Sequence, residues 1–255
     1  MKLSVVIIAY NEADRIEDAL TSARDVADEI IVVDSHSTDN TVEIAESHGA
    51  KVIQHPFKDY GDQKNFAKNQ AAFDWVLNLD ADERVSDQLR GEILKIKEKD
   101  DLPFSAYKIK RKTAYLGRWI THSGWYPDKK IRIFRKDKSQ WIGRIHERLE
   151  VDGEISSELQ GDILHHTYRD MTDHINRLNR YSKMQAVDIV KKGKKLLYIR
   201  AILLPPVTFL RFYIWKLGFL DGFPGFLIAL ISSWATSMKY LKSIELKREK
   251  KRKTS

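Results

Sequence analysis

The sequence predicts an α/β fold, with a mainly parallel sheet covered by helices on both faces and an apolar helical segment near the C-terminal end. In the first part of the chain, short apolar runs alternate with segments of helical periodicity. Strands that alternate with helices need right-handed crossovers, which place successive strands parallel in one sheet. Beyond Lys195 the chain is strongly apolar until a basic run begins at Lys247.

Four short runs are rich in β-branched and apolar residues without polar alternation, which is typical of strands covered on both faces. They are residues 3–8, 29–33, 51–53 and 75–79. The first run gives way at once to Tyr10, Asn11 and Glu12, so it is too short for the apolar region of a signal peptide. We therefore expect this run to be a buried strand; the absence of cysteine fits a reducing cytoplasm, where we expect the protein to be.

Helical periodicity fills the segments between these runs. Within residues 13–23, the side chains of Ile16, Ala19 and Leu20 fall on one stripe. Further helices are predicted over residues 37–49, where Ser37 supplies N-cap chemistry, and over 63–73 and 87–98. The alternation of strand and helix thus continues to the end of this part.

The pattern changes after Pro103. Residues 106–111, 131–135 and 145–151 alternate like half-exposed strands, and residues 172–190 have the spacing of a helix. We therefore divide the chain into a first α/β half (1–102), a second half of the same domain (103–170), apolar C-terminal helices (171–243) and a basic tail (244–255).

The charge distribution indicates a membrane partner. The net charge is +8, and cysteine is absent, which excludes a disulfide framework and a thiolate metal site. A lysine cluster at 191–195 and the basic run 247–253 flank the apolar segment. Such flanking runs favour an anionic membrane surface. Nucleic acid is the competing partner, but the sequence contains no nucleic-acid motif, so we expect none.

The apolar segment is predicted to form two helices that lie in the membrane interface, with Tyr213, Trp215 and Trp234 at headgroup depth. A span is disfavoured, because residues 224–238 contain four hydroxyl side chains and fall short of the roughly 20 apolar residues that a span needs. Pro205 and Pro206 interrupt the preceding stretch. The alternative is a helical hairpin packed on the enzyme or on a second subunit, which would give a homo-oligomer.

Acidic residues follow two of the predicted strands, where ligands of parallel sheets bind. Asp34 ends the second strand, and Asp80 and Asp82 follow the fourth. Carboxylates suit Mg²⁺ or Mn²⁺, a nucleotide diphosphate can complete the shell, and the metal then helps the nucleotide to leave. The structural alternatives are a turn cap for Asp34 and helix N-terminal acids for the pair. The loop after the first strand has no glycine, so it lacks both dinucleotide and Walker A patterns.

Three motifs resemble family 2 glycosyltransferases, which are inverting enzymes with the Rossmann-like GT-A fold. They are residues 4–12 (SVVIIAYNE), 31–39 (IVVDSHSTD) and 77–83 (LNLDADE), in that order. Residues 61–66 (GDQKNF) and 145–149 (IHERL), with the apolar C-terminal region, resemble the branch that adds glucose in β-1,4 linkage to the heptose core of lipopolysaccharide.

The resemblance implies a role for each matching residue. The nucleoside, most often uridine, would be held by Ala9, Tyr10, Asn11, Glu12 and Asp34. Lys64 would approach the diphosphate, and Asp80 and Asp82 would bind ribose, phosphate and the metal (Mn²⁺ or Mg²⁺), with Asp82 the more direct ligand. For Lys64 the alternative is one more surface lysine on a helix.

The catalytic base and the acceptor site come from the second half. Inverting transfer needs a base for the acceptor hydroxyl, and we expect Glu147; its alternative role is an ion pair with Arg144 or Arg148. The resemblance to GT-A enzymes implies a C-terminal histidine in the metal shell, and we expect His165 in this role, with His166 as the substitute. Trp125 and Tyr126 are candidates for stacking on an acceptor sugar, although aromatic side chains in such positions also serve as core.

The sequence therefore predicts a metal-dependent, inverting glycosyltransferase. It would move a hexose, with glucose as the first candidate, from a UDP-linked donor to a saccharide or glycolipid acceptor such as lipopolysaccharide core. We expect it to be peripheral on the inner face of the cytoplasmic membrane. The alternatives are a sugar nucleotidyltransferase and a non-catalytic membrane-associated scaffold with the same fold.

Overall fold

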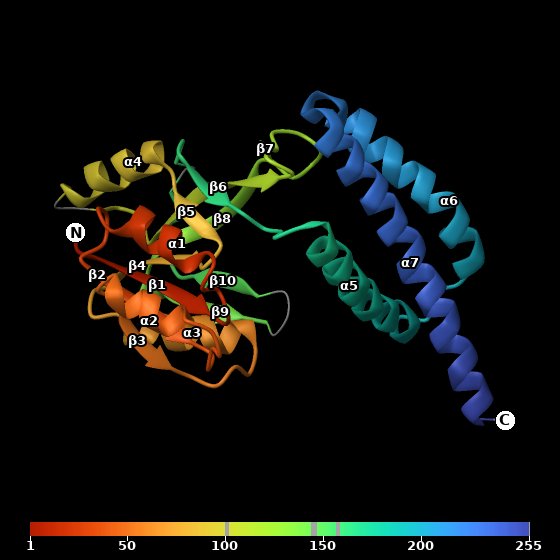
Figure 1. Ribbon diagram of the computed structural model, residues 1–255, viewed down its shortest axis with the longest axis horizontal. Helices are drawn as coiled ribbons and strands as arrows, with labels where there is room; N and C mark the ends of the chain where they lie inside the picture. Colours follow the sequence, from red (N-terminus) through yellow and green to blue (C-terminus); the bar gives the residue numbers. More distant parts are fainter. Residues whose placement is uncertain (100–101, 144–146, 157–158, 255) are drawn as a thin grey trace. The chain divides into compact units, whose positions relative to one another are not determined.

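The computed structural model describes residues 1–99, 102–143, 147–156 and 159–254 (Figure 1). The chain forms two compact units. The first contains Met1–Lys112 and Asp128–His165, and the second contains Thr113–Pro127 and His166–Ser255. The sequence analysis placed residues 113–127 in the second half of the domain (103–170), whereas the structure groups them with the C-terminal helices.

The first unit is built on a mixed sheet whose first half is parallel. In order across the sheet, these parallel strands are β3 (Lys51–Gln54), β2 (Glu29–Asp34), β1 (Leu3–Ala9) and β4 (Trp75–Asp80). Ile7 lies between Val32 on β2 and Leu79 on β4. The predicted strands and their parallel arrangement are confirmed.

Beyond β4 the sheet becomes antiparallel. The strands that continue it are β8 (Asp128–Arg135), β6 (Ala106–Tyr115), β11 (Asp162–His165) and β5 (Glu83–Val85). β8 is antiparallel to β4 and to β6, and β11 is antiparallel to β5. The connection from β6 to β8 contains no helix, because antiparallel neighbours need no helical crossover.

The two faces of the sheet are covered by different elements. Val5 and Ile7 pack in one core with α1 (Ile16–Ala23), α2 (Thr41–Ser47) and α4 (Asp87–Lys97). Val6 and Val76 point to the opposite face. They pack there with α3 (Tyr60–Gln70) and with Trp141 of the hairpin β9–β10 (Ser139–Ile142 and Arg148–Val151). The absence of polar alternation in β1 follows from this burial on both sides.

Helix α3 begins three residues before the predicted start. Asp59 is its N-cap, and the Asp59 carboxylate accepts a hydrogen bond from the Asp62 N–H at 2.9 Å. An N-cap carboxylate satisfies one of the amide groups that the first helical turn leaves without a partner. The earlier start brings Lys64 into the second turn of a buried helix, with only 5% of its surface exposed.

The second unit contains the tip of β6, the short strand β7 (Arg118–Trp119) that pairs with it, and the C-terminal helices. These are α5 (Met171–Lys191), α6 (Leu197–Leu210), the π-helical turn η2 (Arg211–Trp215), the 3-10 turn η3 (Gly218–Asp221) and α7 (Gly222–Thr254). The basic run 247–253 thus belongs to a helix, where the sequence suggested a tail.

Helix α6 continues through Pro205 and Pro206, which the sequence had suggested as an interruption. Proline has no N–H, so Pro205 leaves the carbonyl of Ala201 without its usual helical donor. The hydroxyl of Ser237 on α7 donates to this Ala201 oxygen at 3.1 Å, and the hydroxyl of Ser233 donates to the Pro205 oxygen at 2.8 Å. The Ser237 hydroxyl therefore replaces the donor that Pro205 cannot supply, and the Ser233 bond is an additional contact between the two helices.

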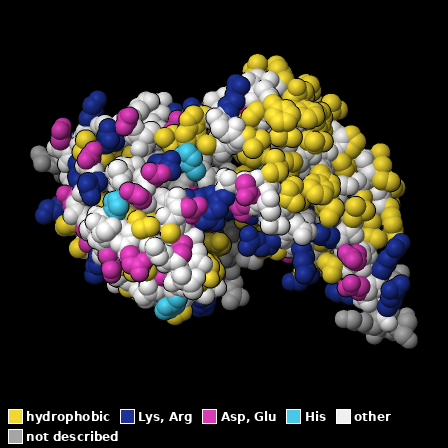
Figure 2. Space-filling view, in the orientation of Figure 1, with side chains coloured by type: hydrophobic (Ala, Val, Ile, Leu, Met, Phe, Trp, Pro, Cys, Tyr) yellow, Lys and Arg dark blue, Asp and Glu magenta, His cyan; other side chains and the backbone are white. Residues whose placement is uncertain are grey.

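Two helical stretches in this unit, Leu197–Trp215 and Gly218–Lys250, are long and apolar enough to cross a membrane. Ile202, Leu203, Trp215 and Phe223 are each at least 60% exposed. Figure 2 shows the hydrophobic side chains gathered over α6 and the first part of α7, with charged side chains at the far end of α7.

Candidate active site

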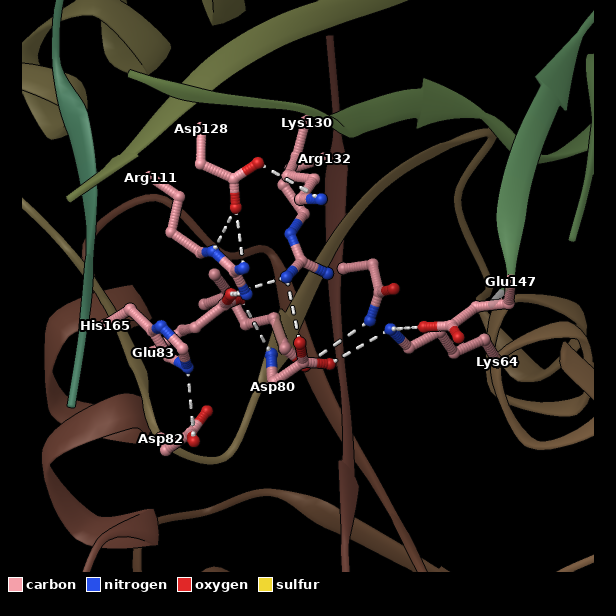
Figure 3. A network of polar contacts seen from close by, with 12 residues as sticks. Lys64, Asp80, Asp82, Glu83, Arg111, Asp128, Lys130, Arg132, Glu147 and His165 are labelled. Carbon is pink, nitrogen blue, oxygen red and sulfur yellow. Dashed lines mark hydrogen bonds and ion pairs between the residues drawn. The ribbon is translucent and has the colours of Figure 1, made fainter. Parts of the chain in front are cut away.

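Asp80, at the end of β4, is neutralised by two cations (Figure 3). Its Oδ1 lies 3.2 Å from Nζ of Lys64, and its Oδ2 accepts a hydrogen bond from Arg132 at 2.9 Å. Burial alone would raise the pKa of Asp80, but Arg132 and Lys64 outweigh it and hold the pKa well below its usual value. Both carboxylate oxygens therefore already have cationic partners.

Asp82 lies one residue beyond Ala81 and has different neighbours. Its Oδ2 is 3.4 Å from Nε2 of His165 and 3.6 Å from Nη1 of Arg15. This Nη1 atom is buried and makes no hydrogen bond. Strand β11 pairs with β5 so that His165 stands opposite Glu83, and this register brings the imidazole to Asp82 from 83 residues away in the chain.

The Asp82–His165 pair can contribute two ligands to a divalent metal. Within the described residues, no group of three or more His, Asp or Glu side chains is arranged to hold a metal without help. The carboxylate suits Mg²⁺ or Mn²⁺, whose remaining ligands a diphosphate and water can supply, and the imidazole can add one nitrogen ligand. Asp80, the other predicted ligand, has its oxygens on Lys64 and Arg132.

A buried carboxylate behind Asp80 was missed by the sequence analysis. Glu83 is fully buried and accepts hydrogen bonds from the Asp80 N–H at 3.1 Å, from Arg132, and from Arg111 at 3.3 Å. Arg111 in turn bonds Asp128 at 2.6 Å. These residues form a charge network that fixes the Asp80 loop against β6 and β8, as Figure 3 shows.

Lys64 connects Asp80 to the predicted catalytic base. Its Nζ donates to Oε1 of Glu147 at 2.9 Å and also lies 4.9 Å from the ring centre of Trp141. Among the described residues, the ion-pair partner of Glu147 is thus Lys64, while Arg148 pairs with Glu150. Arg144 and His146 lie outside the described residues. The structure brings Glu147, Lys64 and Asp80 into one chain of contacts.

The loops after β1 and β2 are joined by hydrogen bonds. Asn11 has a positive φ of 53°, its N–H donates to the Ser37 hydroxyl at 2.9 Å, and its Oδ1 accepts from the Thr38 N–H at 2.8 Å. The Asp34 carboxylate is buried and bonded by the N–H and hydroxyl of Ser37. The predicted nucleoside residues are therefore neighbours, and Asp34 also acts as the turn cap that the sequence left open.

Within this group, Ala9 is buried, whereas the ring of Tyr10 is 57% exposed. The N–H of Glu12 donates to the Thr41 hydroxyl at 2.9 Å, which fixes the loop to the start of α2. An exposed aromatic ring on a loop held this firmly can stack on a flat base or sugar.

The predicted acceptor residues lie in the second unit. Trp125 packs with Tyr115 and Tyr168 at centroid distances of 5.4 and 6.2 Å, and Tyr126 forms a cis peptide bond with Pro127. His166, the substitute metal ligand, is also in this unit, where its ring meets Trp119 edge-on. His165 is thus the histidine that the structure brings to Asp82.

The model of glycosyl transferase family 2 matches residues 4–148, which is more than half of the chain. The chain belongs to this family. The mixed sheet, parallel up to β4 and antiparallel beyond it, is accordingly the GT-A arrangement that the sequence predicted.

Relatives extend the similarity over nearly the whole chain. An uncharacterized glycosyltransferase of Rickettsia typhi, RT0209, is 34% identical and covers 96% of this chain and 87% of its own length. LpsC of Rhizobium meliloti, described as a lipopolysaccharide core biosynthesis glycosyltransferase, is 28% identical and covers 97% and 94%. The crystal structure of S. aureus TarS 1–349 aligns with a TM-score of 0.48 at 19% identity, covering 100% of this chain and 92% of that one.

Proposed function

We propose that this glycosyltransferase is metal-dependent and inverting, and that it transfers a hexose, glucose in the first instance, from a UDP-linked donor to a saccharide acceptor of the cell envelope. One observation carries the proposal. At the carboxyl end of β4, Asp82 lies against His165, and the neighbouring Asp80 contacts Lys64, which in turn contacts Glu147. The similarity to LpsC over 97% of this chain supports lipopolysaccharide core as the acceptor class.

The donor would bind along the carboxyl edge of the parallel strands. The joined loops carrying Asn11 and Asp34 would hold the nucleoside. Lys64 would meet the diphosphate, because its buried ammonium group lies beside Asp80 at the carboxyl end of β4. Asp82 and His165 would hold the metal, which when bound neutralises charge on the departing nucleoside diphosphate.

Glu147 would take the proton. The acceptor hydroxyl oxygen forms a bond to the anomeric carbon, the bond from that carbon to the diphosphate oxygen breaks, and the hydroxyl proton passes to Glu147. Lys64 holds Oε1 of Glu147 at 2.9 Å, so we assign the proton to Oε2. The ammonium group also keeps the carboxylate in a fixed orientation during the attack.

A panel of nucleotide sugars tests the donor assignment. The full-length protein is incubated with each sugar nucleotide and Mn²⁺, and release of the nucleoside diphosphate is followed with and without delipidated lipopolysaccharide core. We expect UDP-glucose to be hydrolysed slowly and to be turned over faster with the acceptor. Turnover of a different nucleotide sugar, or turnover unaffected by a chelator, would reject the corresponding part of the proposal.

The C-terminal helices would hold the enzyme at an anionic membrane as a peripheral protein. The exposed apolar residues of α6 and α7 and the basic end of α7 supply apolar area and positive charge. Removing residues 247–255 deletes basic residues beyond Ile244, the last residue of the α5–α6–α7 core. We expect weaker binding to vesicles with phosphatidylserine and no change with neutral vesicles; equal loss on both would reject the electrostatic contribution.

A further inference from the structure

The second unit contains a cavity of about 300 Å³ whose lining includes none of the residues of the Asp80–Asp82 site. Its walls are the turn between β6 and β7 (residues 114–119) and the segment 166–170 that leads into α5. This volume lies at the lower end of the range for small-molecule sites. It therefore suits one sugar residue or one charged group of a larger ligand.

The chemistry of the lining is aromatic and cationic. Trp119 and His166 meet edge-on at 5.2 Å between ring centres, both are half-buried, and Tyr168 also lines the cavity. Arg118 and Arg169 bring two exposed guanidinium groups to the rim. Aromatic rings suit the C–H faces of sugars, and guanidinium groups bind phosphate or carboxylate in a bidentate manner.

The acidic residue of the lining, Asp170, caps a helix. Asp170 is the N-cap of α5, and its Oδ1 accepts a hydrogen bond from the Asp173 N–H at 2.7 Å. The Arg118 side chain is steadied by one bond, from Nη2 to the Leu220 carbonyl oxygen at 3.1 Å, which leaves most of its five N–H donors for other partners. The rim thus favours an anion.

The back wall of the cavity is rigid. The Tyr115 hydroxyl is hydrogen-bonded to Nδ1 of His174 at 2.8 Å, and Tyr168 stacks on the His174 ring at 4.0 Å. Burial lowers the pKa of His174 to about 4, so this wall stays uncharged near neutral pH. A preformed wall reduces the entropy lost when a ligand binds.

The chain itself connects this cavity to the candidate active site. His165, which lies against Asp82, is followed directly by His166 of the lining. Consecutive Cα atoms are about 3.8 Å apart across a trans peptide bond. A ligand in the cavity is therefore bound by the residue adjacent to the predicted metal ligand.

We propose that this cavity is an acceptor subsite for an acidic sugar, one that carries a phosphate or a carboxylate. The proposal rests on the proposed function and deepens it. The acidic sugar docks between Trp119 and Tyr168, its anionic group pairs with Arg118 and Arg169, and a hydroxyl group elsewhere on the same oligosaccharide receives the transferred hexose.

Binding and kinetics with delipidated lipopolysaccharide core oligosaccharide test the proposal. The core is used in native, phosphatase-treated and carboxyl-reduced forms. Calorimetry measures its affinity whether or not turnover occurs. For the double variant Arg118→Gln/Arg169→Gln we expect at least tenfold weaker binding and a similar increase in the acceptor KM. Loss of a hydrogen bond to a charged group weakens affinity by about this factor. The KM for the nucleotide sugar and its slow hydrolysis stay unchanged.

The matched control is Arg180→Gln, which removes an exposed arginine of α5 outside the lining. Trp119→Leu tests the stacking surface, and Trp119→Phe should restore much of the affinity. Loss of affinity after phosphatase treatment identifies a phosphate, and loss after carboxyl reduction identifies a carboxylate. Unchanged affinity in the arginine and Trp119→Leu variants, or equal binding of all three core forms, overturns the subsite. Absence of nucleotide-sugar turnover in the unaltered protein would instead contradict the proposed function.

Discussion

Replacing Arg132 by methionine should destabilise the first unit more than any comparable surface change. The Arg132 side chain is almost completely buried and donates to both Asp80 and Glu83. Glu83 is fully buried, so no water can replace the lost donor, and Arg111 at 3.3 Å remains as a more distant cation. Removing one partner of a buried ion pair typically costs about 3–5 kcal/mol.

The loss is measured as the free energy of unfolding in urea. Arg135→Met is the matched control, because Arg135 lies on the same strand, is more than a third exposed and pairs with Asp137 two residues away. An exposed pair contributes at most about 1 kcal/mol. If the two substitutions cost the same, the charge network does not stabilise the fold, and the reasoning from burial fails.

Acid titration gives a second readout on the same variant. The pKa of Asp80 in the folded protein is below its usual value, so Asp80 stabilises the protein above pH 3.8 and this stabilisation is lost as the pH falls further. Arg132→Met raises the pKa of Asp80 toward 3.8. The variant should therefore be less stable at neutral pH and lose less of its remaining stability between pH 4 and pH 2.

The remaining predictions concern metal, base and pH. Asp82→Asn should weaken Mn²⁺ binding in the presence of UDP by about 10- to 100-fold or more, measured by calorimetry, while Asp14→Asn, a change at an exposed carboxylate, leaves it unchanged. Glu147→Gln should keep UDP-sugar binding and lose transfer; retained transfer would move the base elsewhere. Because burial lowers the pKa of His174 to about 4, the folded protein should lose about 2 kcal/mol of stability between pH 7.5 and pH 5, as the unfolded chain takes up a proton that the folded one does not. His174→Gln should remove this part of the pH dependence of the melting temperature, and an unchanged profile would show that His174 is not its source.

Sequence patterns predicted the parallel half of the fold because its residues are buried on both faces. Val5 is buried on one face of the sheet and Val6 on the other, so both positions are apolar. The continuous apolar runs at β1 and β2 therefore differ clearly from the helical periodicity around them. Ligands of parallel sheets bind at the carboxyl ends of the strands, so the polar residues at these ends are predicted to line the ligand site. This is why Asp80 and Asp82 could be placed before the structure was known.

The antiparallel half was harder to predict, because its alternation is irregular. A β-bulge shifts the register between Tyr107 and Lys108, and one extra residue changes which side chains face the core. Tyr107 pairs with Ile133 and Lys108 with Ile131, so Arg132 is the extra residue on β8, and strand alternation does not predict its burial. Its partner Glu83 becomes recognisable only when β5 and β8 are known to meet.

The spacing of an Asp-x-Asp motif does not by itself assign roles to its two carboxylates. Asp80 has a cation on each oxygen, so it is already neutralised by the protein and contributes to the fold of the loop. Asp82 faces His165 and Arg15 at 3.4 and 3.6 Å, longer contacts that a metal and a diphosphate can replace at a smaller cost. The difference comes from residues on β8 and α3 that lie far away in the sequence. A substitution at Arg132 should therefore raise the pKa of Asp80 and leave the proposed metal site at Asp82 and His165 largely intact.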